Sequence, residues 1–313
     1  MIKRLIYLTI PVALAVFSSC KHKELCYDPH DGLIRTEMNI VIHWQDGVTK
    51  PAKGMMVNLF GVGATPHYGM EHFPADGGPV SLVTDGTYHG TCYDYYAENI
   101  YFRNEYDYQA LEAYCAPLTR ATYSRAFPDD VTVAEPDFPF WVDRVQDFPV
   151  TGEDMHYYPD NVVEVFTFEI RNVEGAQYIS ACRGGIGGMS ASYGIFEGTL
   201  AQVASTVLFD AAKDGANKKI TGSFRTFGRV NASAVTNNFT IEILYPSKNG
   251  GIIHATWDVT DQVVAALHIP GIPDIIIDND GRIPPIIPDD DDKGSGFEAD
   301  VERWEDITVP MPM

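Results

Sequence analysis

Alternation of apolar and polar residues is the feature that most limits how this chain can fold. Residues 36–44 (TEMNIVIHW) place Met38, Ile40, Ile42 and Trp44 at every second position, with mostly polar residues between them. Successive side chains of a β-strand point to opposite faces, so this pattern predicts a strand with one buried face. Apolar residues at helical spacing are scarce by comparison. We therefore predict an all-β fold.

Runs rich in valine, isoleucine, threonine and tyrosine recur along the rest of the chain. Residues 161–173 (NVVEVFTFEIRNV) form the most strongly β-branched of them, which favours a strand. Asp85-Gly86 is typical of a hairpin turn, and the glycine-rich segment 184–192 (GGIGGMSAS) indicates a loop between strands. One short helix is expected at residues 261–269. Further strands are expected at residues 55–63, 79–102, 177–184, 218–228, 237–246 and 250–260.

Prolines divide this pattern near the middle of the chain. Residues 127–149 contain too many prolines for a central strand, because proline has no backbone N–H to donate. We place a domain boundary near residue 150, which gives an N-terminal domain over residues 35–150 and a C-terminal domain over residues 151–313. Many short strands, glycine turns and little helix favour β-sandwiches for both domains.

The first twenty residues have the layout of a bacterial export signal. Two basic residues precede an apolar run over residues 5–17, and two serines stand directly before Cys20. The apolar run is too short to span a hydrocarbon core of about 30 Å as a helix. We predict a lipoprotein in which residues 1–19 are removed, Cys20 carries the acyl chains (palmitate among them) and residues 20–34 form a tether. We expect the lipid to anchor the protein in the outer membrane, with the folded chain exposed at the cell surface; the sequence leaves the periplasmic face open as the alternative.

A zinc site is the alternative interpretation of the stretch that follows. Cys20, His22, Cys26 and His30 lie within eleven residues. An acylated Cys20 has a thioether sulfur instead of the thiolate that zinc needs. The three remaining residues lack the paired spacing that closes a four-ligand site. A polar tether therefore explains the stretch better than a metal site does.

Cysteines outside the lipidation site could form disulfides in an exported protein. Cys26, Cys92, Cys115 and Cys182 allow three connectivities, and the sequence cannot choose among them. Cys92 and Cys115 lie in neighbouring extended segments, which makes them our favoured pair. Free, buried thiols are the alternative.

Charge and motifs argue against several classes of function. The net charge of −21 would repel nucleic acid, which is therefore not an expected partner. Segment 184–192 lacks the glycine order of a dinucleotide site and the last glycine of a nucleophile elbow. Residues 277–283 (IDNDGRI) lack the first and last ligands of a calcium loop and fit a turn at Asn279-Asp280-Gly281 better. We expect no enzyme, no metal and no cofactor.

Tyrosines are concentrated in residues 92–114 (CYDYYAENIYFRNEYDYQALEAY). Because aromatic faces can stack on sugar rings, Tyr95, Tyr96, Tyr101 and Tyr106 are candidates for a glycan-binding platform. Cross-strand tyrosine pairs also stabilise β-sheets. Packing is the favoured interpretation, and glycan contact is the alternative.

Several short motifs follow one another through most of the chain: CKHKELCYDPHD, YDYYAENIYFRN, GGMSASYGIFEG, TGSFRTFG, WDVTDQV and VERWEDITVPM. Their order resembles a family of Bacteroides lipoproteins related to the anchor and accessory subunits of Bacteroidetes type V fimbriae, the FimB-type and fimbrillin-like proteins. The resemblance implies two tandem transthyretin-like β-sandwich domains without a cofactor. It also implies an anchor, tip or accessory role in a pilus, with fimbrillin-like subunits as partners and strands donated between subunits.

The C-terminal residues are our candidate for a strand that faces a partner. Val301, Trp304, Ile307 and Val309 lie in a segment of extended character that two prolines would end. A strand that completes its own domain is the alternative. A fimbrial subunit is the leading hypothesis, a surface glycan-binding lipoprotein the second, and a structural lipoprotein of unknown partner the third.

Overall fold

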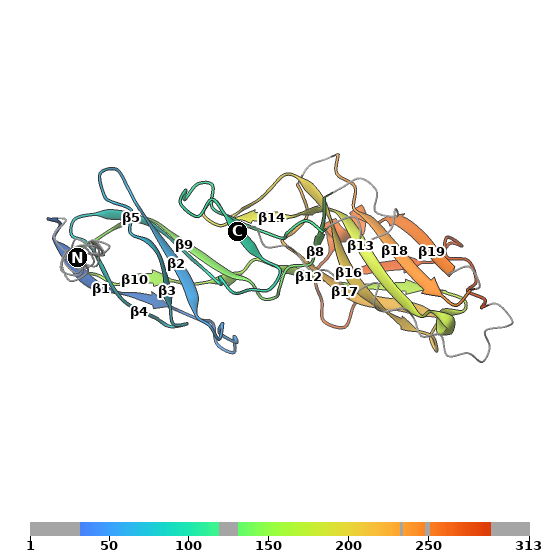
Figure 1. Cartoon of the computed structure of the whole chain (residues 1–313). Helices are drawn as coiled ribbons and strands as arrows, with labels where there is room; N and C mark the ends of the chain where they lie inside the picture. Colours follow the sequence, from blue (N-terminus) through green and yellow to red (C-terminus); the bar gives the residue numbers. More distant parts are fainter. Residues whose placement is uncertain (1–31, 119–130, 232–233, 248–250, 289–313) are drawn as a thin grey trace, which may run out of the picture. The chain divides into compact units, whose positions relative to one another are not determined.

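The chain forms an almost entirely β fold (Figure 1), which confirms the predicted all-β class. The helix α2 (Thr260–Ala265) lies where a helix was expected, but it ends before residue 269 because the backbone of Ala266 is extended. In the part of the chain described, no helix is both long and apolar enough to cross a membrane. The structure, a computed structural model, describes residues 32–118, 131–231, 234–247 and 251–288.

Several predicted features lie outside the described residues. They are the signal segment 1–19, the lipidation site Cys20, the tether up to residue 31, Cys26, and the partner strand with Val301, Trp304, Ile307 and Val309. These features stay predictions.

A first core lies between a three-stranded and a five-stranded sheet. The alternation in the first strand buries Met38, Ile40 and Ile42, as the sequence predicts. Tyr88 and Tyr157 are fully buried beside them. The smaller sheet has the order β10 (Met155–Tyr157), β1 (Arg35–Ile42), β4 (Gly77–Val83), and the larger sheet has the order β11 (Asp160–Asn161), β9 (Trp141–Pro149), β5 (Thr87–Tyr93), β2 (Met55–Gly61), β3 (Gly69–Phe73).

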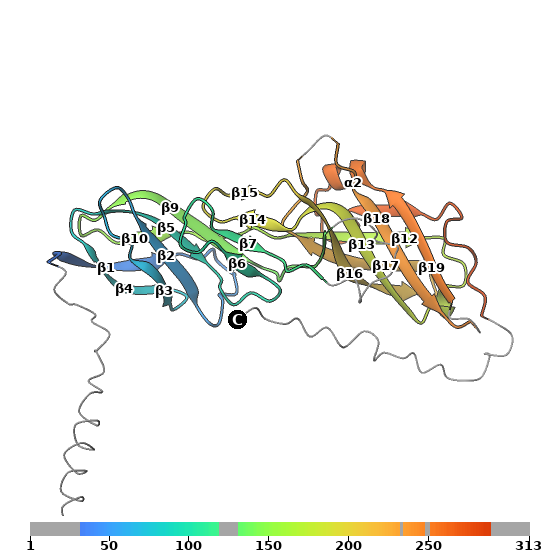
Figure 2. The same ribbon diagram turned by 45° about the horizontal axis from the view of Figure 1, so that its top comes forward.

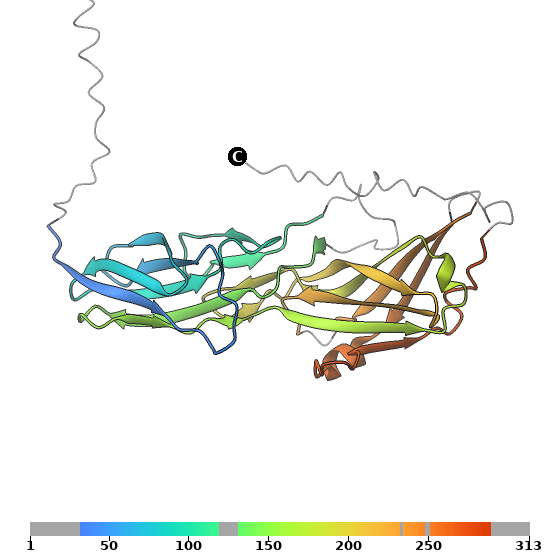
Figure 3. The same cartoon turned by 90° about the horizontal axis from the view of Figure 1, so that it is seen from below.

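A second core is built on an eight-stranded sheet. Stacked phenylalanines fill it: the Phe166 and Phe224 rings lie 5.1 Å apart, and the Phe209 and Phe224 rings lie 4.9 Å apart. The sheet has the order β19 (Gly251–Asp258), β18 (Asn238–Tyr245), β13 (Ala181–Ser190), β16 (Ala204–Asp214), β17 (Lys219–Thr226), β12 (Glu164–Arg171), β20 (Ile275–Asp278), and β8 (Val131–Ala134) pairs with β16. Figure 3 shows β20 running alongside β12, with which it pairs in parallel.

A small four-stranded sheet joins parts of the chain that are far apart in sequence (Figure 2). Its order is β15 (Thr199–Leu200), β14 (Ser192–Gly194), β7 (Glu112–Tyr114), β6 (Tyr101–Arg103). β7 and β8 precede residue 150, yet β7 pairs with β14 and β8 pairs with β16, which follow it. Strand pairing thus connects the two sides of the proposed boundary, and both the division at residue 150 and the transthyretin-like form of each part stay predictions.

The prediction of a loop at the glycine-rich segment 184–192 is wrong. Most of this segment belongs to β13, and Gly184 gives space to an aromatic ring: a Cβ atom there would lie 2.1 Å from Cε2 of Phe209. Gly188 has a φ of 76°, within the stretch between Ile186 and Met189 where the register with β16 shifts. The glycines therefore serve a close ring contact and a bulge inside a strand.

Two expectations about turns and prolines are also wrong. Asp85-Gly86 connects β4 to β5, which lie in different sheets, so it is a corner between sheets and not a hairpin. Its backbone instead holds the end of β9, where the Gly86 carbonyl accepts a hydrogen bond from the Val150 N–H at 2.8 Å. β9 is an internal strand within residues 127–149. This is possible because Pro149 is its last residue and its interior contains no proline.

The prediction of a disulfide between Cys92 and Cys115 is wrong as well. Cys92, Cys115 and Cys182 are free and buried. Cys92 belongs to the first core and Cys115 to the second, so the two sulfurs pack in separate apolar clusters. Burial raises the pKa of the Cys115 thiol to about 12 and that of the Cys182 thiol to about 11, so both stay protonated at neutral pH.

Candidate interaction site

The four-stranded sheet sorts its side chains into an inner and an outer face. Phe102, Ala113 and Tyr193 stand opposite one another across the strands and pack on the second core. Alternate residues of a strand point to the same side, so their neighbours share the opposite face. This outer sheet face carries Tyr101, Arg103, Glu112, Tyr114 and Ser192.

An ion pair fixes the charged groups of the outer sheet face. Arg103 Nε donates a hydrogen bond to Glu112 Oε2 at 2.6 Å, and the Ser192 hydroxyl donates to the other carboxylate oxygen. Burial by itself would raise the pKa of Glu112, but the hydrogen bonds from Arg103 and Ser192 outweigh it and hold this pKa below its ordinary value. Glu112 is therefore ionised at neutral pH and holds Arg103 in one position.

One tyrosine ring lies against this arginine, and a second ring lies beside the first. The guanidinium carbon of Arg103 lies 5.0 Å from the centre of the Tyr114 ring. The Tyr101 ring lies 5.9 Å from the Tyr114 ring, and its side chain is exposed. Tyrosine and arginine are the residue types that most often dominate the binding energy of protein–protein interfaces. Held in place on a sheet, they lose little conformational entropy when a partner binds.

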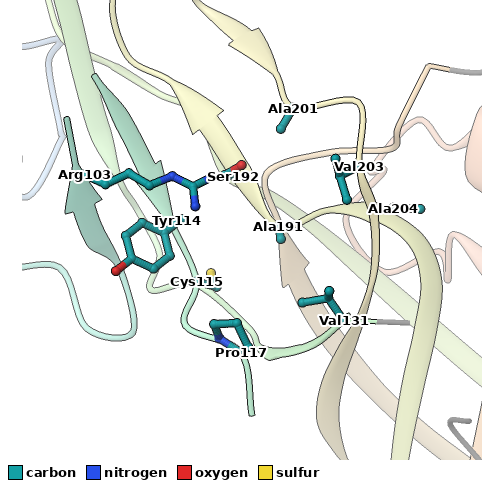
Figure 4. Close-up of a pocket in the computed structure, with 10 residues that line it drawn as sticks. All are labelled: Arg103, Tyr114, Cys115, Pro117, Val131, Ala191, Ser192, Ala201, Val203 and Ala204. Carbon is teal, nitrogen blue, oxygen red and sulfur yellow. The ribbon is translucent and has the colours of Figure 1, made fainter. Parts of the chain in front are cut away.

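A pocket of about 260 Å³ opens beside these residues (Figure 4). Figure 4 shows Arg103 extended above the Tyr114 ring at one end, with Val131 and Val203 at the other. The two valines are 45% and 66% exposed, so apolar surface reaches the mouth of the pocket. Small-molecule sites usually measure about 300–1,000 Å³, so this pocket suits one or two side chains better than a larger ligand. Its other lining residues are Cys115, Pro117, Ala191, Ser192, Ala201 and Ala204.

The lining residues of this pocket fit binding better than catalysis. Burial keeps the Cys115 thiol protonated, and thiolate is the nucleophilic form of cysteine. The Ser192 hydroxyl donates to Glu112, whose carboxylate is already paired with Arg103. Among the lining residues there is thus no nucleophile with a free base beside it.

The four tyrosines predicted as a glycan platform lie in different surroundings. Tyr101 belongs to the outer sheet face. Tyr95 is half-buried and stacks on Phe102 with a ring separation of 5.2 Å. Tyr96 is exposed and perpendicular to Tyr95, at 5.6 Å, and Tyr106 is 83% exposed. Ring contacts join Tyr95 to Tyr96, and the glycan platform itself stays a prediction.

Comparison with known proteins places the chain in a family. A model described as a domain of unknown function (DUF5119) matches residues 19–210, more than half of the chain. The chain belongs to this family. This DUF5119 protein is also 23% identical over 340 aligned positions to a Bacteroides ovatus protein named "Putative fimbrium anchoring subunit Fim4B". The alignment covers 97% of this chain and 98% of that protein.

Solved structures share the fold of this DUF5119 protein. A crystal structure described as a "putative adhesin" from Bacteroides ovatus aligns with a TM-score of 0.64 and 20% identity, over 80% of this chain and 94% of that one. A second adhesin structure of the same description, also from Bacteroides ovatus, has a TM-score of 0.50 and 11% identity, over 78% of this chain and 82% of that one. At these identities the likeness concerns the fold.

Sequence reasoning found one residue of the outer sheet face and missed the rest. Tyr101 stood out as a tyrosine, whereas Arg103 and Tyr114 lie in strands of only three residues each, too short for a clear alternation. The spacing of Tyr101 to Arg103 and of Glu112 to Tyr114 was the available signal. The pocket could not be found in this way, because its lining residues are distributed from position 103 to position 204.

Proposed function

We propose that the protein is a non-enzymatic, lipid-anchored anchor, tip or accessory subunit of a type V, fimbrillin-like pilus at the outer membrane. The observation that supports this most is the end-to-end similarity to a Bacteroides ovatus protein named as a fimbrium anchoring subunit. The tandem transthyretin-like arrangement of its two halves is part of the proposal. The adhesin-described structures support the same class of surface protein through their fold.

In this proposal the parts of the chain have separate tasks. Lipid on Cys20 holds the protein in the membrane, and residues 20–34 form the tether. The outer sheet face and its pocket receive a fimbrillin-like subunit, whose apolar side chain would fill the space beside Tyr114 and Val203. The C-terminal segment with Val301 and Trp304 supplies a strand to that partner or to its own sheet.

A charge placed at the mouth of the pocket tests this assignment. Val203→Asp puts a carboxylate where an apolar partner side chain would sit. Burying an unpaired charge at an interface costs roughly several kcal/mol of binding free energy. Val264→Asp is a matched control, because Val264 is also 66% exposed but does not line the pocket. In the cells that produce the protein, pili should be lost or shed with Val203→Asp and kept with Val264→Asp.

The readouts are electron microscopy of surface pili and the membrane-bound amount of each variant. Equal membrane amounts show that both variants fold and are exported. Normal, attached pili in cells with Val203→Asp would contradict the assignment of the outer sheet face. Normal pili in cells that lack the whole protein would contradict the fimbrial role itself.

A further inference from the structure

The guanidinium group of Arg103 has a side that is open to a ligand. Its Nε atom donates a hydrogen bond to Glu112 Oε2 at 2.6 Å. The other four N–H donors of an arginine belong to its two terminal nitrogens, Nη1 and Nη2. Among the described residues, no group accepts a hydrogen bond from either of these nitrogens. The Arg103 side chain is 52% exposed, so these donors can reach a partner.

The pocket beside Arg103 presents this charge without an opposing carboxylate. Arg103 is the one charged side chain among the described lining residues. Glu112 does not line the pocket, and both of its carboxylate oxygens are engaged, one by Arg103 and the other by Ser192. A ligand that enters therefore contacts the guanidinium and not the carboxylate. In a chain of net charge −21, the pocket thus has a local preference for an anionic group.

Apolar surface begins directly beside the guanidinium. The Tyr114 ring, whose centre lies 5.0 Å from the guanidinium carbon, lines the pocket, and Val131 and Val203 line its other end (Figure 4). The volume of about 260 Å³ suits one or two side chains. A ligand that uses the whole pocket must therefore carry an anionic group and an apolar side chain close together.

The C-terminal residue of a chain has this combination of groups. A carboxylate matches the planar donor fork of a guanidinium, and at a C-terminus it shares one Cα atom with the last side chain. Inside an extended segment, neighbouring side chains point to opposite faces and alternate ones stand about 6.6–6.8 Å apart. An internal aspartate and an apolar side chain are therefore less suited to entering one small pocket together. We propose that the pocket binds the C-terminal residue of the partner subunit, with its α-carboxylate on the free side of Arg103 and its apolar side chain beside Tyr114.

This inference rests on the proposed function and adds the chemistry that the partner must carry. The polar part of the contact is an ion pair, so salt should weaken it. Arginine and an α-carboxylate both stay charged between about pH 5 and pH 8, so binding should change little over this range. Glu112 also stays ionised there, because its pKa lies below the ordinary value, and it keeps Arg103 in place.

Fluorescence anisotropy with labelled peptides tests the proposal on the purified full-length protein in detergent. The probe is a hexapeptide of glycine and serine that ends in leucine, prepared as the free acid and as the C-terminal amide. We expect the free acid to bind with a dissociation constant of about 1 mM or lower. The amide should bind at least about fivefold more weakly, because it lacks the charge that pairs with Arg103. A free-acid peptide that ends in glycine should also bind more weakly, because it leaves the apolar part of the pocket empty.

Variants of two arginines assign the preference for the acid to this site. Arg103→Gln should bind the acid and the amide equally, whereas Arg282→Gln should keep the preference. Arg282 is a matched control, because it is 48% exposed, its Nε pairs with Asp280 at 3.1 Å, and it does not line the pocket. Arg103→Lys keeps the charge but lacks the planar fork, so its preference for the acid should be intermediate. The thermal midpoint of each variant verifies folding, and Arg103→Lys carries the test if Arg103→Gln does not fold.

Three results would overturn the proposal. They are no binding of the free acid at about 1 mM protein, equal binding of acid and amide by the unaltered protein, and a preference for the acid that is retained in Arg103→Gln. Equally tight binding of an amidated peptide with aspartate after the leucine would overturn the C-terminal assignment in favour of an internal carboxylate. Each of these results leaves the fimbrial role standing, which normal pili in cells without the protein would contradict.

Discussion

Residues 92–114 supply tyrosines to two regions of the molecule with opposite character. In the aromatic cluster of Tyr93, Tyr95 and Phe102, the rings pack on one another and on the second core. On the outer sheet face, Tyr114 lies against a fixed arginine and lines an open pocket, and the Tyr101 ring lies beside Tyr114. The residue type is the same, so the position of each tyrosine in the fold decides whether its ring packs inward or stays at the surface.

The two regions also shift the pKa values of their carboxylates in opposite directions. Glu112 on the outer sheet face is held ionised by Arg103 and Ser192. Burial raises the pKa of Glu105, near the aromatic cluster, and burial together with the Glu105 carboxylate raises the pKa of Tyr93. On the outer sheet face hydrogen bonds from Arg103 and Ser192 favour the charged carboxylate, whereas in the packed region burial makes charge less favourable.

The largest expected change in stability follows from removing the buried ring of Tyr93. Tyr93 is fully buried, and its ring lies 4.7 Å from the Phe102 ring. Tyr93→Ala should lower the free energy of unfolding by about 3–5 kcal/mol, because it removes a large buried side chain and leaves a cavity. Urea unfolding followed by intrinsic fluorescence measures it. A loss below about 1 kcal/mol would mean that the aromatic cluster is not packed as described.

A smaller effect is expected at the edge of the aromatic cluster. Tyr95 is half-buried and stacks on Phe102 at 5.2 Å. Tyr95→Ala should lower the free energy of unfolding by about 1–2 kcal/mol, the sum of a stacked pair and partial burial. Tyr95→Phe is the control and should change little, because it keeps the ring. Equal losses in the two variants would show that the hydroxyl, and not stacking, stabilises this edge.

Acid should affect the two carboxylates in opposite directions. The folded pKa of Glu112 is lowered, so its contribution to stability is present above the unfolded pKa and is lost as pH falls through the folded value. The folded pKa of Glu105 is raised, so it favours the folded state more as pH falls through that value. Carboxyl-carbon NMR titration of the wild-type protein, assigned with Glu112→Gln and Glu105→Gln, should give one pKa below and one above the ordinary range. pKa values shifted in the same direction for both carboxylates would contradict the difference between the two regions.

The smallest effect on stability is expected on the outer sheet face itself. Tyr101 is 40% exposed, so Tyr101→Ala should change the free energy of unfolding by no more than about 0.5 kcal/mol. If the outer sheet face receives a fimbrial subunit as proposed, the same substitution should weaken the attachment of pili, because it removes a tyrosine from that interface. A large loss of stability would assign Tyr101 to the packed region instead. The measurement is urea unfolding beside a count of attached pili.

How far the sequence leads depends on the range of the interaction involved. The alternation of Met38, Ile40 and Ile42 predicts β1 correctly, because burial of one face acts within a single strand. Gly184 and Asp85-Gly86 were misread, because their roles depend on Phe209 and on Val150, which lie far away in sequence. A local pattern cannot show which ring or which sheet a glycine approaches.

The same limit applies to the candidate site. Tyr101 could be selected as a tyrosine, but the pairing of Arg103 with Glu112 is set by the register of β6 with β7. The expected pairing of Cys92 with Cys115 failed for a related reason, since neighbouring segments placed the two thiols in different cores. The sequence thus showed which residue types could form a site, whereas only the structure showed which of these residues lie together.

Site-specific photocrosslinking tests the central claim most directly. A benzophenone side chain at position 203 lies at the mouth of the pocket, and the same group at position 264 has the same exposure away from it. In the cells that produce the protein, illumination should link position 203, and not position 264, to a fimbrillin-like subunit identified by mass spectrometry. Crosslinks to that subunit from position 264 alone, or from neither position while pili are attached, would contradict the outer sheet face as the docking surface.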